Sequence, residues 1–397
     1  MEKLSGDKEN KIVVLVGNGF DIQILKHFKS TIDTSYPSFY NFLNWKYAAK
    51  VQNNVIIQKM KGDKELGKES WSDFENTIKE IIKREYETKE EIFDNEQYIS
   101  ALSELQNCFT DFLNTIVTSE LLSKVDKLGK IFKAPEFGGR ESLPLNTMQS
   151  FIGDLTKKER EKLQFKLKIS HHNIIDFTFI NFNYTPLFDN YITLDKKNFD
   201  PHGYKNSPNN FHPQLAFDGT KQEIYTQLVT RIFHPHGYQH TPRSMLFGFD
   251  NPGQIISNYK GDLYTNKEVQ DYVKYFLKPY WAENDRNYKK YLDEAELFIV
   301  FGHSIGDSDR YWWQSIAQNL IQGNSELIIY NYSRNDTKEE KTRIATGFLN
   351  SAGVIDYNER YKALDKIFVV NFNEEKRRYA FNVDSKNTVE KGSENFL

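Results

Sequence analysis

The chain is poor in cysteine: Cys108 is the only one among 397 residues. A single thiol excludes an intramolecular disulfide framework and any zinc or redox site of the Cys-x-x-Cys type. A reducing, cytoplasmic setting fits this composition. At roughly 100–200 residues per domain, the length suggests two or three structural units, or one domain that carries a large insertion.

The sequence also lacks net charge and long apolar runs. Its 52 basic and 55 acidic residues leave a formal charge of −3, which gives no global attraction to nucleic acid or to anionic lipid. The longest apolar runs, at residues 11–16 and 297–301, are far shorter than the roughly 20 residues of a membrane span. The polar N-terminus has no signal-peptide core. We therefore expect neither a membrane nor a nucleic-acid partner.

Strand-like and helical patterns alternate in the second half of the chain. The first predicted strand is residues 11–17, and residues 35–169 then show mostly helical spacing. Further strands are predicted at Ile174–Asn181, Thr230–His234, Ser244–Phe249, Glu296–Gly302, Leu327–Tyr332 and Ile367–Asn371. Helices are predicted at Trp71–Lys83, Glu90–Thr110, Asp111–Lys127, Lys267–Glu294, Arg310–Gln322, Thr337–Asn350 and Arg360–Lys366.

This alternation predicts an α/β fold: a Rossmann-like, mostly parallel sheet with helices on both faces. Because the first strand is separated from the others, we expect a large helical insertion after it. The predicted organisation is a discontinuous α/β domain of residues 11–34 and 170–375, a helical insertion at residues 35–169, and a C-terminal tail at residues 376–397.

A glycine turn, Val-Gly-Asn-Gly-Phe-Asp at residues 16–21, follows the first strand and precedes a helical pattern. Glycines there permit a tight turn and let backbone N–H groups approach a phosphate. Ile22 replaces the third glycine of the dinucleotide fingerprint, which argues against an ordinary nicotinamide dehydrogenase. The alternative is a plain strand–helix turn that Asp21 caps. The candidate ligand contacts are Gly17, Asn18, Gly19, Phe20 and Asp21.

A second polar segment, Asn-Phe-Asn-Tyr-Thr at residues 181–185, ends the next strand. Ligands of open α/β sheets bind outside the carboxyl ends of the strands, so Asn183, Tyr184 and Thr185 are candidate site residues. The asparagine amide has both donors and an acceptor, and it suits a ribose hydroxyl and a water. Thr185 is also expected to cap a helix that begins at Pro186.

Pro-His-Gly-Tyr occurs twice, at residues 201–204 and 235–238, and only the second copy follows a predicted strand. His236 is therefore the candidate general base, since histidine titrates near neutral pH. A structural histidine is one alternative, and a loosely spaced metal site is another. The ligands of that metal site would be His234, His236, His240 and Asp250.

The segment at residues 301–309, Phe-Gly-His-Ser-Ile-Gly-Asp-Ser-Asp, closes another strand and opens a helix that Ser308 or Asp309 is expected to cap. Its side chains offer hydrogen bonds to a ribose or a phosphate. A hydrolase triad is not expected, because neighbours along one turn seldom adopt triad geometry and no Gly-x-Ser-x-Gly occurs. The candidate contacts are Gly302, His303, Ser304, Asp307 and Asp309.

Two aromatic segments are interpreted as structural first. Trp71–Glu75 opens a helix with Ser72 or Asp73 as its cap, and Glu75 is kept as a minor site candidate. The run Tyr311–Trp313 is expected in the core or at a subunit interface.

In their order, GNGFD, WSDFE, NFNYT, HPHG, FGFD and FGHSIGDSD resemble the AbiH family of phage abortive-infection proteins, over roughly residues 11–335. The same succession is similar, more distantly, to SIR2-like NAD-binding domains. This resemblance implies that Gly17 and Gly19 line the dinucleotide phosphates, that Asn183 organises the nicotinamide ribose and the attacking water, and that His236 is the catalytic histidine. Gly302, Ser304 and Asp307 would lie on the adenosine side.

The sequence departs from the SIR2-like pattern in its first turn, where Asn18–Asp21 replaces a Gly-Ala-Gly-type sequence, and in having no zinc-binding cysteines. The resemblance therefore implies a cytoplasmic antiphage effector that binds NAD⁺ and hydrolyses its nicotinamide–ribose bond, without a metal, rather than a deacetylase. The alternatives are a metal-dependent hydrolase or nuclease and a non-catalytic nucleotide sensor. Expected partners are a nucleotide, a phage protein trigger, and a second copy or partner protein bound through the helical insertion.

Overall fold

The core of the protein is one parallel sheet. The computed structural model describes residues 9–68, 71–88, 95–128, 151–165, 174–197, 227–251, 254, 273–374, 378, 380–381 and 383. Within these residues, six parallel strands form a sheet in the order β3-β2-β1-β4-β5-β6, the strand order of dinucleotide-binding Rossmann folds. The strands are β1 (Glu9–Val16), β2 (Ile174–Asn181), β3 (Gln227–Phe233), β4 (Leu297–Phe301), β5 (Glu326–Tyr332) and β6 (Ile367–Phe372).

The first strand pairs with strands that lie far from it in sequence, which confirms the predicted Rossmann-like fold with a helical insertion. β1 lies between β2 and β4. Its last residue, Val16, is in register with Asn181 of β2 and Phe301 of β4. The three strands therefore end at the same level, and the turns that follow them lie side by side.

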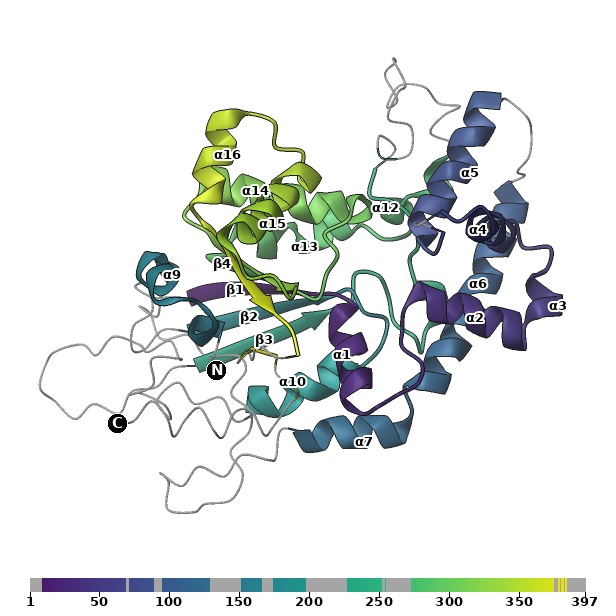
Figure 1. Cartoon of the computed structure of the whole chain (residues 1–397), viewed down its shortest axis with the longest axis horizontal. Helices are drawn as coiled ribbons and strands as arrows, with labels where there is room; N and C mark the ends of the chain where they lie inside the picture. Colours follow the sequence, from purple (N-terminus) through teal and green to yellow (C-terminus); the bar gives the residue numbers. More distant parts are fainter. Residues whose placement is uncertain are drawn as a thin grey trace, which may run out of the picture.

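Helices cover both faces of the sheet (Figure 1). Apolar side chains on one face pack against α1 (Gly19–His27), α7 (Ser119–Leu128) and α10 (Leu187–Lys197). The other face packs against α13 (Asn284–Asp293), α14 (Arg310–Gln322), α15 (Lys338–Ser351) and α16 (Tyr357–Leu364). Burial on both sides explains why the strands are apolar almost throughout.

Trp312 and Trp313 of α14 are fully buried in the second layer, which agrees with the core role expected for them. Ala380, Phe381 and Val383 are buried in the first layer, although they fall in the segment predicted as a tail.

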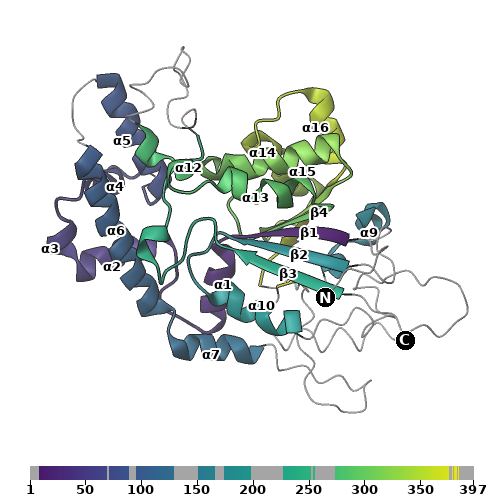
Figure 2. The same ribbon diagram turned by 180° about the vertical axis from the view of Figure 1, so that it is seen from behind.

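A block of helices lies beyond the carboxyl ends of the strands (Figure 2). This helical block consists of α2 (Tyr36–Lys46), α3 (Ala48–Val51), α4 (Val55–Glu65), α5 (Phe74–Thr88) and α6 (Asn95–Ile116). It has its own aromatic-rich core, into which Met245, Phe247 and Phe249 also insert. No helix among the described residues is long and apolar enough to cross a membrane.

Two predicted elements are wrong. Residues 244–249 do not form a strand: their alternating apolar side chains fill the core of the helical block, and their backbone bonds to loops, as from Leu246 N–H to His236 O (2.8 Å). The described part of the predicted helix 267–294 is broken, because Pro279 opens a new short helix. The remaining short elements are α9 (Lys157–Lys162), α12 (Lys278–Trp281), η2 (Phe151–Asp154), η4 (Pro242–Ser244), η6 (Lys274–Phe276) and η7 (Asp307–Asp309).

The turns after β1 and β4 touch through their glycines. Gly17 N–H donates to Phe301 O (2.9 Å), and Gly19 N–H donates to Gly302 O (2.8 Å). A Cβ atom on Gly17 would lie 2.7 Å from Gly302 O. Gly302 itself has a φ of +65° and packs against the backbone of Phe20, where a Cβ would lie 2.8 Å from the nitrogen. The glycines are therefore required for this close approach.

Gly302→Ala is expected to lower the free energy of unfolding by roughly 1–3 kcal/mol, through the left-handed backbone and the clash with Phe20. Chemical denaturation measures this loss. Gly62→Ala in α4 is the control: its Cβ would meet nothing within 4 Å, so roughly 0.5–1 kcal/mol of stabilisation is expected. Equal stability changes in the two variants would contradict this packing account.

Candidate functional site

A cavity of about 730 Å³ lies at the carboxyl ends of β1, β2 and β4, within the usual range for ligand pockets. The order of the sheet reverses between β1 and β4, and open α/β sheets bind ligands at this switch point. One wall comes from the turns after the strands and the other from the helical block. The block contributes Tyr36, Pro37, Glu75, Asn76, Lys79, Phe109 and Leu113, and the turn before α5 contributes Ser72 and Asp73.

The structure brings the predicted site residues together in this cavity. Those that line it are Gly17, Asn18, Gly19, Asp21, Asn183, Tyr184, Thr185, His236, Gly302, His303, Ser304, Asp307 and Asp309. Phe20 is the exception, because its ring is buried in the sheet core against Phe188, Tyr191 and Phe301. Of the two Pro-His-Gly-Tyr copies, residues 235–238 supply His236, whereas residues 201–204 lie outside the described residues.

Asp309 is the centre of a buried charge cluster. Its Oδ1 accepts from Lys278 Nζ at 2.6 Å and lies 3.0 Å from His236 Nε2, and its Oδ2 is 3.6 Å from His303 Nε2. Burial opposes ionisation of this carboxyl, but the Lys278 charge and the His236 hydrogen bond outweigh burial and hold its pKa well below the usual range. Asp309 is therefore ionised at neutral pH, and its oxygens can only accept hydrogen bonds from its neighbours.

This carboxylate sets the tautomer of His236. Burial, together with the Lys278 charge, lowers the pKa of His236, so the imidazole is neutral at pH 7. Because Nε2 faces an ionised carboxylate, Nε2 carries the proton. Nδ1 then has the lone pair of a base, and the side chain lines the cavity. His236 is thus prepared to accept a proton.

His303 has the same tautomer. Its Nδ1 accepts from Ile305 N–H at 3.1 Å, which leaves the proton on Nε2, toward Asp309. Burial lowers the pKa of His303 to about 4, so this ring also stays neutral. Ile305 has a φ of +55°, an uncommon conformation for a β-branched residue, of the kind that clusters at functional sites.

Asn183 is held by its backbone and leaves its amide unpartnered. Its N–H donates to Asn181 Oδ1 (3.1 Å), and its carbonyl accepts from His234 Nδ1 (3.1 Å). Within the described part of the chain, neither Asn183 Nδ2 nor Oδ1 has a hydrogen-bond partner, although the residue is only 3% exposed. Buried polar groups are normally paired, so this amide, which lines the cavity, has donors and an acceptor that the described residues leave unused.

His234 holds the Asn183 turn in place. Its Nε2 lies 3.0 Å from Asp189 Oδ1, while Nδ1 bonds to the Asn183 carbonyl. Burial lowers the pKa of His234, but the hydrogen bond and the charge of Asp189 outweigh burial, so the net effect is a raised pKa. Both ring nitrogens therefore face oxygen acceptors, and neither offers a lone pair to a metal.

The side chains expected to bind a metal in the alternative site make other contacts instead. Besides His234, Asp250 Oδ2 accepts from Tyr311 N–H (3.0 Å), and exposed His240 packs against the Tyr238 ring. Over the described ranges, no group of three or more His, Cys, Asp or Glu side chains is arranged to hold a metal ion. Asp309 stands at the N-cap position of α14, as expected, but its side chain makes no capping hydrogen bond, and Asp250 accepts from the first turn of the helix instead.

A hydrogen bond between Asp21 and Thr185 joins the segment after β1 to the turn after β2. Asp21 Oδ2 accepts from Thr185 Oγ1 at 2.6 Å, and Thr185 Oγ1 in turn accepts from Leu187 N–H (3.4 Å) at the start of α10, near the cap position expected for it. Asp21 does not cap α1. Burial raises the pKa of Asp21 to about 7, although the Thr185 hydrogen bond opposes this shift.

Asp21→Asn is expected to stabilise the protein at pH 8. The folded pKa of about 7 exceeds the unfolded value near 4, so the folded state keeps a proton that the unfolded state loses, and stability falls as pH rises between these values. Asparagine mimics the neutral acid and removes this loss, a gain of roughly 2–4 kcal/mol at pH 8 that disappears toward pH 4. Thermal unfolding from pH 4 to 8 measures it.

Asp33→Asn provides the opposite control. Burial opposes ionisation of Asp33, but hydrogen bonds from Ser35 and Ser38 outweigh it and lower its pKa, so that variant should lose stability at pH 8. If Asp21→Asn also loses stability at pH 8, the assigned environment of Asp21 is incorrect.

Sequence reasoning missed Lys278. This residue is 2% exposed and lies at the start of α12, outside every motif. Burial lowers the pKa of Lys278, but Asp309, Asp250 and Glu75 together raise it, so the ammonium stays charged.

Glu75, a minor candidate from sequence, lies in the cavity wall, and Asp73 caps α5 by accepting from Asn76 N–H (2.8 Å).

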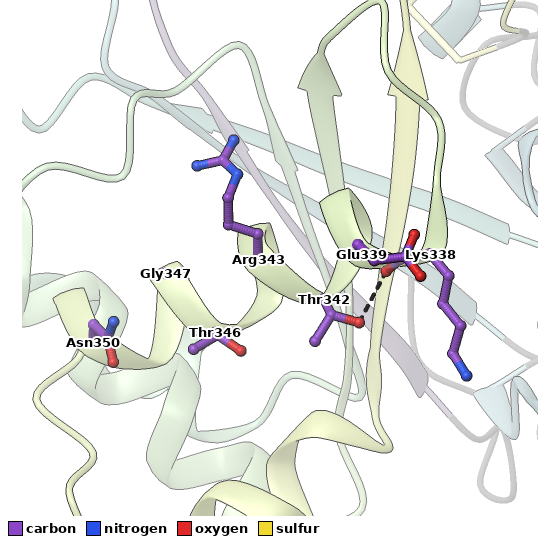
Figure 3. Close-up of a pocket in the computed structure, with 7 residues that line it drawn as sticks. All are labelled: Lys338, Glu339, Thr342, Arg343, Thr346, Gly347 and Asn350. Carbon is purple, nitrogen blue, oxygen red and sulfur yellow. Dashed lines mark hydrogen bonds between the residues drawn. The ribbon is translucent and has the colours of Figure 1, made fainter.

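A second hollow, of about 700 Å³, lies on α15 (Figure 3). All seven of its lining residues come from this one helix, and most of them are exposed. Thr342 Oγ1 bonds back to Lys338 O (2.9 Å), and Arg343 pairs with Glu340. We therefore place the functional site in the cavity at the strand ends.

The fold and the cavity define a Rossmann-like α/β protein with a polar site at its switch point. The family model described as "Bacteriophage abortive infection AbiH" matches residues 13–332. The chain belongs to this family, and its role is in abortive infection, a defence against bacteriophage. The comparison with curated proteins finds no match.

Proposed function

We propose that this chain is a cytoplasmic antiphage effector that hydrolyses NAD⁺ to nicotinamide, ADP-ribose and a proton. The observation that carries this proposal is the pair formed by the unpartnered Asn183 amide and the neutral His236 base, which line the same cavity at the switch point of a Rossmann-like sheet.

The chemistry matches these two side chains. Nicotinamide leaves NAD⁺ as a neutral molecule, so its departure needs no acid. The site has to orient a water and the ribose and to accept one proton from that water. The Asn183 amide supplies a donor and an acceptor for orientation, and His236 Nδ1 accepts the proton, a contribution of about 10²–10⁴ in rate.

Other cavity groups would hold the remainder of the dinucleotide. The N–H groups of Gly17 and Gly19 donate to protein carbonyls, so these glycines would line the phosphates by close approach rather than by donating to them. Lys79 supplies positive charge, and Ser304 and Ser308 supply hydroxyl groups. A phage protein or a second copy of the chain would act through the helical block, because that block forms one wall of the cavity.

The test is to incubate the purified chain with NAD⁺, with and without lysate of phage-infected cells, and to follow nicotinamide and ADP-ribose by chromatography. The proposal predicts equal amounts of both products once the chain is activated, with no effect of a chelator. Binding of NAD⁺ without turnover would instead support a nucleotide sensor. Loss of activity with a chelator would support a metal-dependent hydrolase.

A further inference from the structure

We infer that the helical block supplies a catalytic carboxylate, Glu75, which contacts the nicotinamide ribose and stabilises the positive charge that develops at its C1′ carbon. This inference rests on the proposed function, and it assigns part of the reaction to a residue outside the α/β sheet.

The position of Glu75 follows from how α5 begins. Asp73 caps the helix, and Glu75 lies in its first turn. Glu75, Asn76 and Lys79 of α5 line the cavity, as does Ser72 just before the helix, and the three- and four-residue spacing of Lys79 from Asn76 and Glu75 places these three on one face of α5. The start of α5 therefore presents a row of polar side chains to the strand ends.

Contacts place Glu75 near the Asn183 turn. Tyr36 OH donates to Glu75 Oε1 (3.3 Å), and the Tyr36 hydroxyl also lies beside that of Tyr184, the residue after Asn183. Tyr184 OH donates to Leu246 O at 3.0 Å. Glu75 also experiences the charges of Lys278 and Asp309, so it lies close to the cluster that orients His236.

Glu75 differs from the other carboxylates of the cavity because it accepts few hydrogen bonds from the protein and is also partly exposed. Asp309 is neutralised by Lys278, Asp73 caps α5, and Asp307 pairs with Arg310 at 2.9 Å. Asp21 accepts only from Thr185, and its Oδ1 has no partner among the described residues, but this side chain is only 1% exposed, whereas Glu75 is partly exposed. Glu75 receives only a tyrosine hydroxyl and its own N–H among the interactions described for it. Its negative charge is therefore available to a ligand.

The reaction accounts for such a charge. The C1′–N bond breaks and its electron pair goes to the nicotinamide nitrogen; the water oxygen bonds to C1′, and the water proton passes to His236 Nδ1. The ribose is cationic in the transition state, as in other glycosyl transfers. A fixed carboxylate that accepts from a ribose hydroxyl stabilises this cation strongly in a site shielded from water.

Glu75→Gln is the test, with Glu80→Gln as the matched control. Glu80 lies on the same helix but pairs with Lys59 and Lys68 outside the cavity. In the activated nicotinamide-release assay, Glu75→Gln is expected to lower kcat by about 10²–10³ with KM changed less than about threefold, whereas Glu80→Gln keeps wild-type kcat. Glutamine still accepts from Tyr36 OH, and thermal unfolding of both variants verifies that they fold.

The pH profile separates a catalytic from a structural role. Burial raises the pKa of Glu75 to about 7, so wild-type kcat should begin to fall as pH drops below about 7. Protonation of His236, whose pKa is lowered, causes a further decline at lower pH, and Glu75→Gln should keep only that second decline. The titratable and charged groups that interact with Glu75 are Tyr36, Asp73, Tyr98, Tyr184, Lys278 and Asp309.

Three outcomes are decisive. Loss of kcat together with loss of the decline that begins near pH 7 supports the inference. If Glu75→Gln keeps wild-type kcat, or still begins to decline near pH 7, the inference is overturned while hydrolysis by the wild type still supports the proposed function. If the activated wild type releases no nicotinamide, both the inference and the proposed function are overturned.

Discussion

Asn183→Ala is expected to lower nicotinamide release by about 10²–10³ without destabilising the protein. The activity falls because the amide that orients the water and the ribose is removed. The stability does not fall, because within the described residues this side chain makes no hydrogen bond that the variant would lose. Removing an unpaired buried amide can even raise the melting temperature. The release assay and thermal unfolding, done on the same preparations, measure both quantities.

Asn181→Ala is the matched control for this variant. Asn181 Nδ2 donates to Asp189 Oδ2 (3.0 Å), and its Oδ1 accepts the Asn183 N–H. Removing the Asn181 side chain should therefore lower the free energy of unfolding by about 1–3 kcal/mol. If Asn183→Ala is destabilised as much as Asn181→Ala, the Asn183 amide has a structural role, contrary to the function assigned to it.

Lys278→Met is expected to lower the free energy of unfolding by about 3–5 kcal/mol, because it leaves a buried Asp309 without its ammonium partner. The double variant Lys278→Met/Asp309→Asn should recover part of this loss, since the uncompensated charge is then gone. Chemical denaturation of the single and double variants gives the values. Lys289→Met, at an exposed pair with Asp293, should cost less than about 1 kcal/mol.

The loss in Lys278→Met should depend on pH. The Lys278 charge lowers the pKa of His236, so without it the folded pKa of His236 rises and the imidazolium pairs with Asp309. A raised folded pKa gives stabilisation at low pH that is lost as pH rises. The variant should therefore be less impaired at pH 6 than at pH 8. Equal losses at both values, or a loss no larger than that of Lys289→Met, would contradict the cluster described for Asp309.

The sheet and most of the site were predictable because both depend on local patterns. Apolar runs that end in glycine or asparagine predict buried strands and polar turns, and the parallel arrangement brings those turns to one edge. Residues 244–249 misled the prediction, because alternating apolar residues fit a half-buried strand as well as a segment that inserts into a helical core.

The polar partners of the site could not be predicted in this way. Lys278 belongs to no motif, and its burial against Asp309 arises only when α12 packs beside the turn after β4. Glu75 gains its place in the cavity from the docking of the helical block on the sheet. Asp250 is predicted only as a metal ligand, yet its Oδ2 accepts from Tyr311 N–H in the first turn of α14.

The most direct test of the account is the NAD⁺ content of infected cells that carry the wild-type chain or Asn183→Ala at equal protein levels. Mass spectrometry over the infection should show NAD⁺ falling and ADP-ribose rising with the wild type before the cells arrest, and neither change with Asn183→Ala. If wild-type cells arrest while their NAD⁺ matches that of the variant, NAD⁺ hydrolysis is not how this protein acts.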